Sequence, residues 1–75
     1  MEEYRIKLDS TDKIKEFVNE AEKCDFDIDV FYNSRIIDGK SILGLLAFDL
    51  SNEIIVNCHG NNIEFERTLR KFQIR

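Results

Sequence analysis

Apolar and polar side chains alternate along the first residues of the chain. Over residues 3–8 every second side chain is apolar and the others are charged, which is the period of a β-strand with one buried face. Residues 9–12 are polar and supply candidate helix N-caps. Apolar residues then recur at helical spacing, namely Ile14, Phe17, Val18 and Ala21. The pattern predicts a strand and then a helix that ends near Cys24.

The middle of the chain predicts a hairpin. Residues 26–30 alternate apolar side chains with aspartates, as a second half-buried strand would. Asn33 and Ser34 interrupt this pattern, and residues 35–37 resume a short apolar stretch. Because asparagine and serine favour tight turns, we expect two antiparallel strands here.

The last third of the chain predicts a strand and a helix. Residues 53–58 alternate again, and His59 with Gly60 forms the turn that follows. Asn61 is a natural N-cap, with Glu64 three residues on as the partner of a capping box. The helix that it would start carries an apolar stripe at helical spacing, formed by Phe65, Leu69 and Phe72.

A segment between these parts, "DGKSILGLLAFDL" (residues 38–50), is apolar on nearly every side. We predict a three-turn helix over residues 41–50, with Ser41 as its N-cap. A helix on the outer layer of so small a protein cannot bury all of its sides. We expect the inward face to be formed by Leu43, Leu46 or Ala47, and Leu50. The candidate partner-binding residues are the remaining apolar ones and the lysine before the cap: Lys40, Ile42, Leu45 and Phe48.

The predicted order is strand, helix, strand, strand, short helix, strand, helix. Four strands and three helices favour an α+β fold of two layers, an antiparallel sheet with helices on one face. A ferredoxin-like arrangement shares the βαββαβ core, so the pattern alone leaves both open. A chain of 75 residues closes one modest core, and no repeat or linker divides it. We expect a single domain over residues 1–75.

The charge of the chain argues against one class of partner. The net charge is −4, whereas binding to a phosphate backbone needs a concentrated Lys/Arg face. Four basic residues group near the end of the chain, namely Arg67, Arg70, Lys71 and Arg75, and the others are scattered. No stretch approaches the ~20 apolar residues of a membrane span, and the first residues are not signal-like. We therefore expect a cytoplasmic protein that binds neither nucleic acid nor membranes.

Three aspartates have the spacing that opens a calcium loop. They are Asp25, Asp27 and Asp29. Val30 stands where such a loop needs glycine, and Ile36 stands where it needs a bidentate carboxylate. Strand alternation accounts for the aspartates, so we expect no metal site.

The remaining reactive residues form no catalytic set in the sequence. Cys24 and Cys58 lack metal-ligand spacing and are too few for a disulfide scaffold, so we expect reduced thiols. The sequence contains no glycine-rich phosphate loop and no Ser/His/Asp set. We predict that the protein is not an enzyme and needs no cofactor.

The order of elements and two segments of the chain resemble the HPr family, the histidine phosphocarriers of the sugar phosphotransferase system. "GKSILGLLAFDL" is similar to the regulatory serine segment of these proteins, and "FVNEAEKCDFDIDV" is similar to their first helix and second strand. The similarity covers residues 4–72. It implies an open-faced βαββαβα sandwich, with a four-stranded antiparallel sheet and three helices on one face, in preference to the ferredoxin-like fold.

The connection between the first strand and the first helix departs from this family. HPr carries its phosphoryl group there on a histidine, with an arginine close by. Here the connection reads "LDSTDKIKEF" and holds neither residue, while Asp9 and Asp12 would repel a dianionic phosphoryl group. His59 is the sole histidine, and the HPr topology places it at the opposite pole, as a turn or surface residue. We expect no phosphocarrier activity at the usual loop.

Ser41 is the candidate phosphorylation site. As a helix N-cap it already has a structural explanation, worth ~1 kcal/mol. The resemblance adds that it matches the serine modified by HPr kinases in Gram-positive bacteria. A phosphate there would lie at the positive end of a helix dipole and bring about −1.5 to −2 units of charge to the rim of an apolar surface.

These observations leave three hypotheses. The first is an HPr-like, non-carrier regulatory protein that docks on a protein partner through residues 41–50 and is switched at Ser41. It resembles the catabolite-repression HPr homologues that lack the carrier histidine, which implies an HPr kinase or a transcriptional regulator as partner. The second is a degenerate phosphotransfer component that uses His59 or another phosphoacceptor. The third is a structural module whose apolar helix is covered by loops or by a second copy of the chain. We expect a monomer or a weak homodimer.

Overall fold

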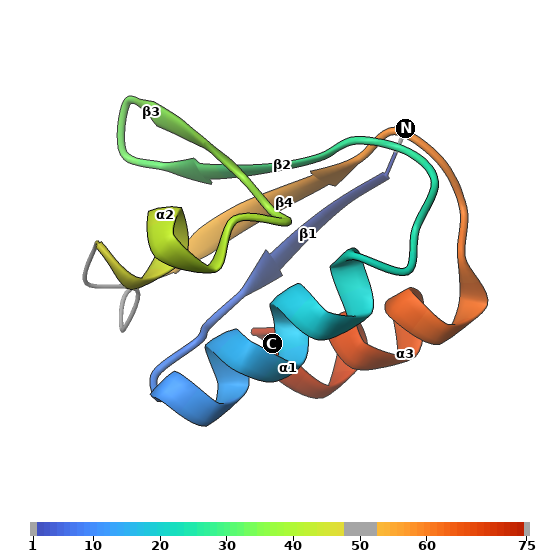
Figure 1. Ribbon diagram of the computed structural model, residues 1–75, viewed down its shortest axis with the longest axis horizontal. Coiled ribbons are helices and arrows are strands. Elements are labelled where there is room, and N and C mark those ends of the chain that lie inside the picture. Colours follow the sequence, from blue (N-terminus) through green and yellow to red (C-terminus); the bar gives the residue numbers. More distant parts are fainter. Residues whose placement is uncertain (1, 48–52, 75) are drawn as a thin grey trace.

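The computed structural model describes residues 2–47 and 53–74. Within them, strands and helices follow one another in the predicted order: β1 (Glu2–Ile6), α1 (Thr11–Ala21), β2 (Ile28–Tyr32), β3 (Arg35–Asp38), α2 (Ile42–Leu46), β4 (Ile54–Cys58) and α3 (Ile63–Phe72). Figure 1 shows the helices below the sheet, with α1 and α3 side by side and α2 under β3. None of the helices in the described part of the chain is long and apolar enough to cross a membrane.

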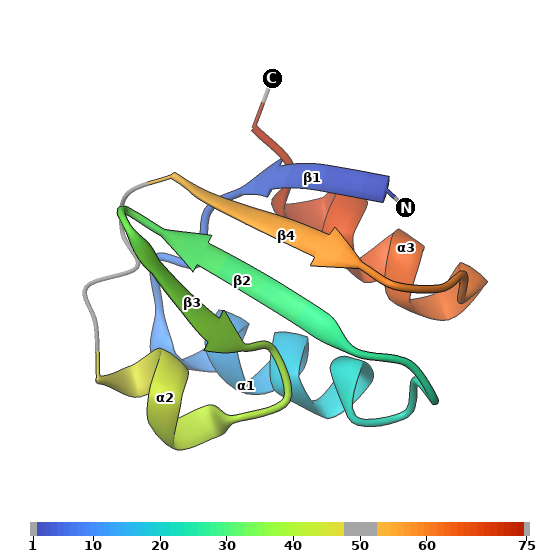
Figure 2. The same ribbon diagram turned by 90° about the horizontal axis from the view of Figure 1, so that it is seen from above.

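The four strands form one antiparallel sheet in the order β1-β4-β2-β3. β4 pairs with both β1 and β2, and β2 pairs with β3. β1 therefore lies at an edge, whereas the first strand of a ferredoxin-like sheet lies in the interior. The helices cover one face, and Figure 2 looks onto the other face, which no helix of the described chain covers. This is the open-faced βαββαβα sandwich that the resemblance implies.

The core lies between the sheet and the helices, and the predicted alternation fills it. The inward side chains of the strands are buried, among them Ile6, Val30 and Val56 at 0% exposed. The predicted face of α1 is also buried, with all four of its members in the core. The rings of Phe17 and Phe65 meet edge to face with their centroids 5.5 Å apart, which joins α1 to α3.

Side chains at the helix starts explain where α1 and α3 begin. The Ser10 hydroxyl accepts a hydrogen bond from the Lys13 backbone N–H at 3.2 Å, as the polar cluster predicts. At α3 the predicted N-cap, Asn61, is wrong by one residue. Asn62 caps α3, and its Oδ1 accepts from the Phe65 N–H at 2.9 Å. Asn61 therefore lies before the cap, since only one of the two adjacent amides can reach the third helical N–H.

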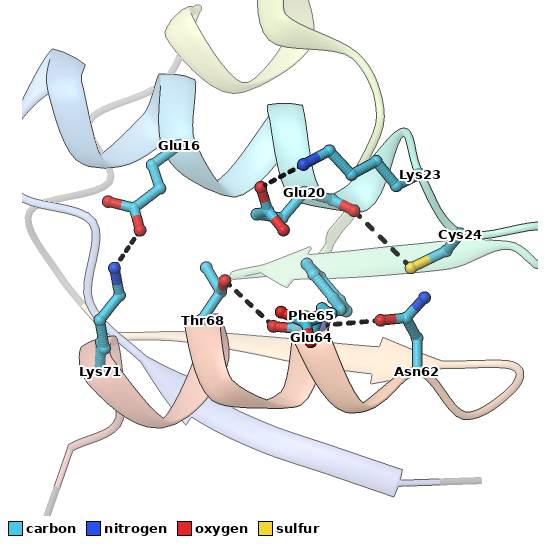
Figure 3. A network of polar contacts seen from close by, with 9 residues as sticks. All are labelled: Glu16, Glu20, Lys23, Cys24, Asn62, Glu64, Phe65, Thr68 and Lys71. Carbon is cyan, nitrogen blue, oxygen red and sulfur yellow. Dashed lines mark hydrogen bonds and ion pairs between the residues drawn. The ribbon is translucent and has the colours of Figure 1, made fainter.

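Polar contacts join α1 to α3 and stabilise the ends of both helices (Figure 3). Lys71 of α3 forms an ion pair with Glu16 of α1. The Cys24 sulfur lies 3.8 Å from the Glu20 carbonyl oxygen at the end of α1. Both cysteines are buried and free, and burial raises the pKa of the Cys24 thiol. The thiol is therefore protonated at neutral pH, in agreement with the prediction of reduced cysteines.

Candidate functional site

The turn before α2 is fixed against β2. Gly39 donates its N–H to the Ile28 carbonyl at 2.7 Å. A Cβ at Gly39 would lie 2.6 Å from Ile28 Cγ2 and 2.9 Å from the same carbonyl oxygen, so only glycine fits this approach. The next residue, Lys40, donates its N–H to the Asp38 carboxylate at 3.0 Å. The position of Ser41 is thus set by the strands.

Ser41 is the N-cap of α2, as predicted. Its hydroxyl oxygen accepts a hydrogen bond from the Gly44 N–H at 3.1 Å. Gly44 leaves room for this contact, because a Cβ there would lie 3.1 Å from both the Ser41 hydroxyl oxygen and the Ile37 side chain. The Ser41 side chain is partly exposed. A kinase could therefore reach the hydroxyl group, provided that the cap opens.

Ser41→Ala should lower the free energy of unfolding by about 0.5–2 kcal/mol, because the Gly44 N–H loses its acceptor. Urea denaturation followed by circular dichroism measures this difference. Ser41→Asn is the matched control, since an asparagine amide oxygen can cap the same N–H. Equal losses in the two variants would show that the cap is not what Ser41 contributes.

α2 is much shorter than the helix predicted over residues 41–50. It has five residues and ends at the C-cap Ala47, about one and a half turns. The prediction of its inward face was wrong. Leu45 is 0% exposed and belongs to the core, whereas Leu43 is 80% exposed and Leu46 is 44% exposed. So short a helix has no extended stripe, and the turn at residues 38–41 decides which side chain points inward.

The other predicted partner-binding residues fall in three different environments. Ile42 is half-buried and packs against the core. Lys40 makes a structural contact, because its ammonium donates to the Cys24 carbonyl beyond the end of α1 at 2.8 Å. Phe48 and Leu50 lie outside the described residues. The exposed leucines of α2 are thus Leu43 and Leu46, both of which the apolar pattern predicts on the inward face.

An open groove runs between α1 and α2. It has a volume of about 560 Å³ and is lined by Lys15, Glu16, Val18, Asn19, Glu22 and Ile42. Its lining combines the apolar side chains of Val18 and Ile42 with charged side chains of both signs. We use the name α2 surface for Ile42, Leu43 and Leu46 together with this groove. Sequence periodicity could not reveal the groove, because it depends on how the two helices pack.

The connection between β1 and α1 contains the N-cap of α1 and an ion pair. Asp9 forms an ion pair with Lys13 at 2.7 Å. The Lys13 ammonium holds the pKa of the Asp9 carboxyl below its ordinary value, so this carboxylate stays ionised at neutral pH. Ser10 uses its hydroxyl to cap α1. The polar side chains of this connection therefore stabilise the start of α1, and the charge of Asp9 is paired with that of Lys13.

His59 lies at the opposite end of the sheet from that connection. β4 pairs its last residue, Cys58, with Glu2 and its first residue, Ile54, with Ile6. His59 follows Cys58, so the predicted separation from the β1–α1 connection is confirmed. The structure adds a contact that the sequence did not show: His59 Nε2 lies 2.8 Å from the Asp29 carboxylate. Only the register between β2 and β4 brings these residues together.

The three aspartates of the apparent calcium spacing do not converge. In the described residues, no group of three or more His, Cys, Asp or Glu side chains could hold a metal ion. Asp29 contacts His59, and the Asp27 carbonyl accepts from the His59 N–H at 3.0 Å. Asp25 lies before the strand, in an exposed bend. β2 begins at Ile28, so strand alternation accounts for Asp29 alone, and the prediction of a strand face formed by all three aspartates is wrong.

Comparisons with known proteins locate this fold among solved structures. No model of a known protein family matches the chain, and no curated protein matches it. The structure is similar to that of HPr-C-His from Thermoanaerobacter tengcongensis, with a TM-score of 0.78 and 23% identity over 95% of this chain and 89% of that one. It is also similar to the phosphocarrier protein HPr from Bacillus anthracis, with a TM-score of 0.71 and 22% identity over 96% and 94% of the two chains.

A third similar structure is Crh, the catabolite repression containing protein of Bacillus subtilis. Its TM-score is 0.66, with 18% identity over 95% of this chain and 88% of that one. Its crystal structure is described as an intertwined dimer with a swapped domain. Together these similarities show that the chain has the HPr fold over nearly its whole length.

Proposed function

We propose that this protein is an HPr-like regulatory protein that carries no phosphoryl group between enzymes and docks on a protein partner through the α2 surface. The observation that carries the proposal is the exposed pair Leu43 and Leu46 on an HPr fold, two and five residues after a partly exposed serine. Exposed apolar side chains beside a groove are the usual composition of a protein-binding surface. The protein would act in the bacterial cytoplasm as a single domain.

The β1–α1 connection argues against a carrier role. In the HPr family this connection holds the phosphorylated histidine, whereas here it presents the ionised carboxylate of Asp9. Asp9 is ion-paired with Lys13, and the connection contains no histidine that could accept a phosphoryl group. His59 is at the other end of the sheet, with its Nε2 already occupied by Asp29. A degenerate carrier using His59 would thus place the phosphoryl group beside a carboxylate.

Ser41 is the residue through which we propose that docking is regulated. Phosphorylation would add about −1.5 to −2 units of charge two residues before the exposed Leu43. A partner that buries Leu43 in an apolar pocket would then have to desolvate a dianion, while a partner with an arginine at its rim would gain an ion pair. The similarity to Crh, a catabolite repression protein, supports a regulatory role. We propose a monomer or weak homodimer as the active form.

Phosphorylation by an HPr kinase with ATP tests the proposal. We expect one phosphate on Ser41, mapped by mass spectrometry, and no label in Ser41→Ala. Ser34→Ala is the matched control, because Ser34 is exposed in the turn between β2 and β3 and should leave labelling unchanged. An unlabelled wild-type protein, in an assay that labels authentic HPr, would contradict the proposed switch. Label that persists in Ser41→Ala would assign it to another residue.

A further inference from the structure

The bare face of the sheet carries an apolar row in register across all four strands. Strand pairing places Arg5, Ile55, Phe31 and Ile36 opposite one another in this order. Ile36 is 66% exposed, although it lies in a strand, and Phe31 and Ile55 are half-buried. Figure 2 looks onto this face, with β3 at its outer edge. Within the described residues no element covers these three apolar side chains.

The neighbouring row on the same face is acidic. It consists of Glu3, Asn57, Asp29 and Asp38, paired across the strands in that order. Arg5, the cation of the apolar row, is engaged by Glu53 through two hydrogen bonds of 2.7 and 2.8 Å. The face therefore offers three carboxylates beside an apolar row, and its arginine is already neutralised.

Two of these carboxylates lie on directly paired residues. Asp29 is the cross-strand partner of Asp38, and like charges at such positions destabilise a sheet. His59 contacts the first carboxylate, and the Lys40 backbone N–H contacts the second. The Lys40 N–H leaves the charge of the Asp38 carboxylate in place, so the two carboxylates still face each other across the strands. An added ammonium or guanidinium group would relieve the repulsion and gain two partners.

We propose that this open face binds an extended segment of another protein whose side chains on one face alternate between apolar and basic. Such a segment would pair with β3, the edge strand of the sheet, with its apolar side chains beside Ile36 and its basic ones beside Asp38, the cross-strand partner of Asp29. Backbone pairing at a sheet edge provides affinity, and alternate side chains provide specificity. The site is separate from the α2 surface and goes beyond the proposed function.

The charge of the face selects this partner over the other occupants. Nucleic acid and anionic lipid would be repelled by the acidic row. A second copy of the chain has a net charge of −4, and its open face offers an arginine already held by Glu53. A basic segment instead complements the acidic row, which favours fast and specific association.

Titration of the uniformly ¹⁵N-labelled protein with a synthetic peptide of repeating Lys-Thr-Val-Thr tests the proposal. Lysine and valine then alternate on one face of the strand. We expect saturable amide shifts in β3 and β2, and weaker binding at higher salt. A matched peptide with glutamate in place of lysine should bind about tenfold more weakly or not at all. Equal binding of both peptides, or shifts confined to α2, would overturn the proposal.

Two variants separate the site from a loss of folding. Asp38→Asn keeps an acceptor for the Lys40 N–H and removes the charge opposite Asp29, so its melting temperature should not fall, while its affinity for the lysine peptide falls about tenfold. Leu43→Lys, on the α2 surface, should bind the peptide like the wild type. Unchanged affinity in Asp38→Asn would contradict the proposal. A dimer in sedimentation equilibrium that the peptide dissociates would assign the face to a second copy instead.

Discussion

Leu45→Ala will lower the free energy of unfolding by about 2–5 kcal/mol, the range for deleting a buried leucine side chain. Leu45 is 0% exposed and belongs to the core. Its truncation leaves a cavity, and movement of the five-residue helix α2 can close this cavity only in part. Leu43→Ala should change stability by no more than about 0.5 kcal/mol, because its side chain is 80% exposed. Both values come from urea denaturation at equilibrium.

Both variants replace a leucine of α2 by alanine, at positions two residues apart. Each variant is therefore the control for the other. If the free energy of unfolding depends equally steeply on urea concentration in both variants, the two proteins expose the same surface on unfolding, and their stabilities can be compared. A large loss in Leu43→Ala together with a small one in Leu45→Ala would mean that α2 packs with the opposite face inward. The α2 surface as defined by Leu43 and Leu46 would then be wrong.

Replacing Leu43 and Leu46 together by lysine should reduce the rate at which an HPr kinase phosphorylates Ser41 by about tenfold or more. Burying each leucine in a partner contributes about 1.5–3 kcal/mol, and a lysine there must be desolvated. Both side chains are exposed, so the free protein should keep its stability. The measurement is the initial rate of phosphate incorporation at a kinase concentration below saturation.

Ile63→Lys is the matched control for this docking variant. Ile63 is 70% exposed at the start of α3, so the change adds one lysine at an exposed apolar position outside the α2 surface. Its phosphorylation rate should equal that of the wild type. A similar decrease in both proteins would indicate an effect of net charge, and an unchanged rate in the double variant would reject docking through Leu43 and Leu46.

The sequence predicts those elements whose apolar pattern repeats over several turns or residues. In α1 the stripe of four residues runs through the whole helix, and all four are buried. β2 and β4 are predicted for the same reason, since alternate side chains of each strand face the core. An apolar pattern that extends along a whole helix or strand can be buried in one orientation only. The face that turns toward the core can then be predicted without knowledge of the elements that pack against it.

The orientation of α2 could not be predicted in this way. Leucine or isoleucine occupies four of its five positions, so the pattern fits either orientation. Its direction follows from Gly39 packed on Ile28 and from the Ser41 cap. These are contacts with β2 and within the turn, and periodicity carries no information about them. The cap itself was predictable, because it depends on one local hydrogen bond.

Contacts between distant residues depend on strand register and were not predicted. His59 meets Asp29 only because β2 pairs with β4 in the observed register. The acidic and apolar rows of the open face have the same origin, since their members come from four strands. The alternating pattern predicts the outward position of Asp29 in β2, but it does not show that Asp38 lies opposite this residue.

Transfer of phosphate from phosphoenolpyruvate tests whether this protein carries phosphoryl groups. The protein is incubated with phosphoenolpyruvate and the general phosphotransferase enzyme, with an authentic HPr in the same tube as the control. We expect label on HPr and none on this protein, because the β1–α1 connection contains no histidine and His59 is paired with Asp29. Acid-labile label on this protein that disappears in His59→Ala would show a phosphocarrier and contradict the account.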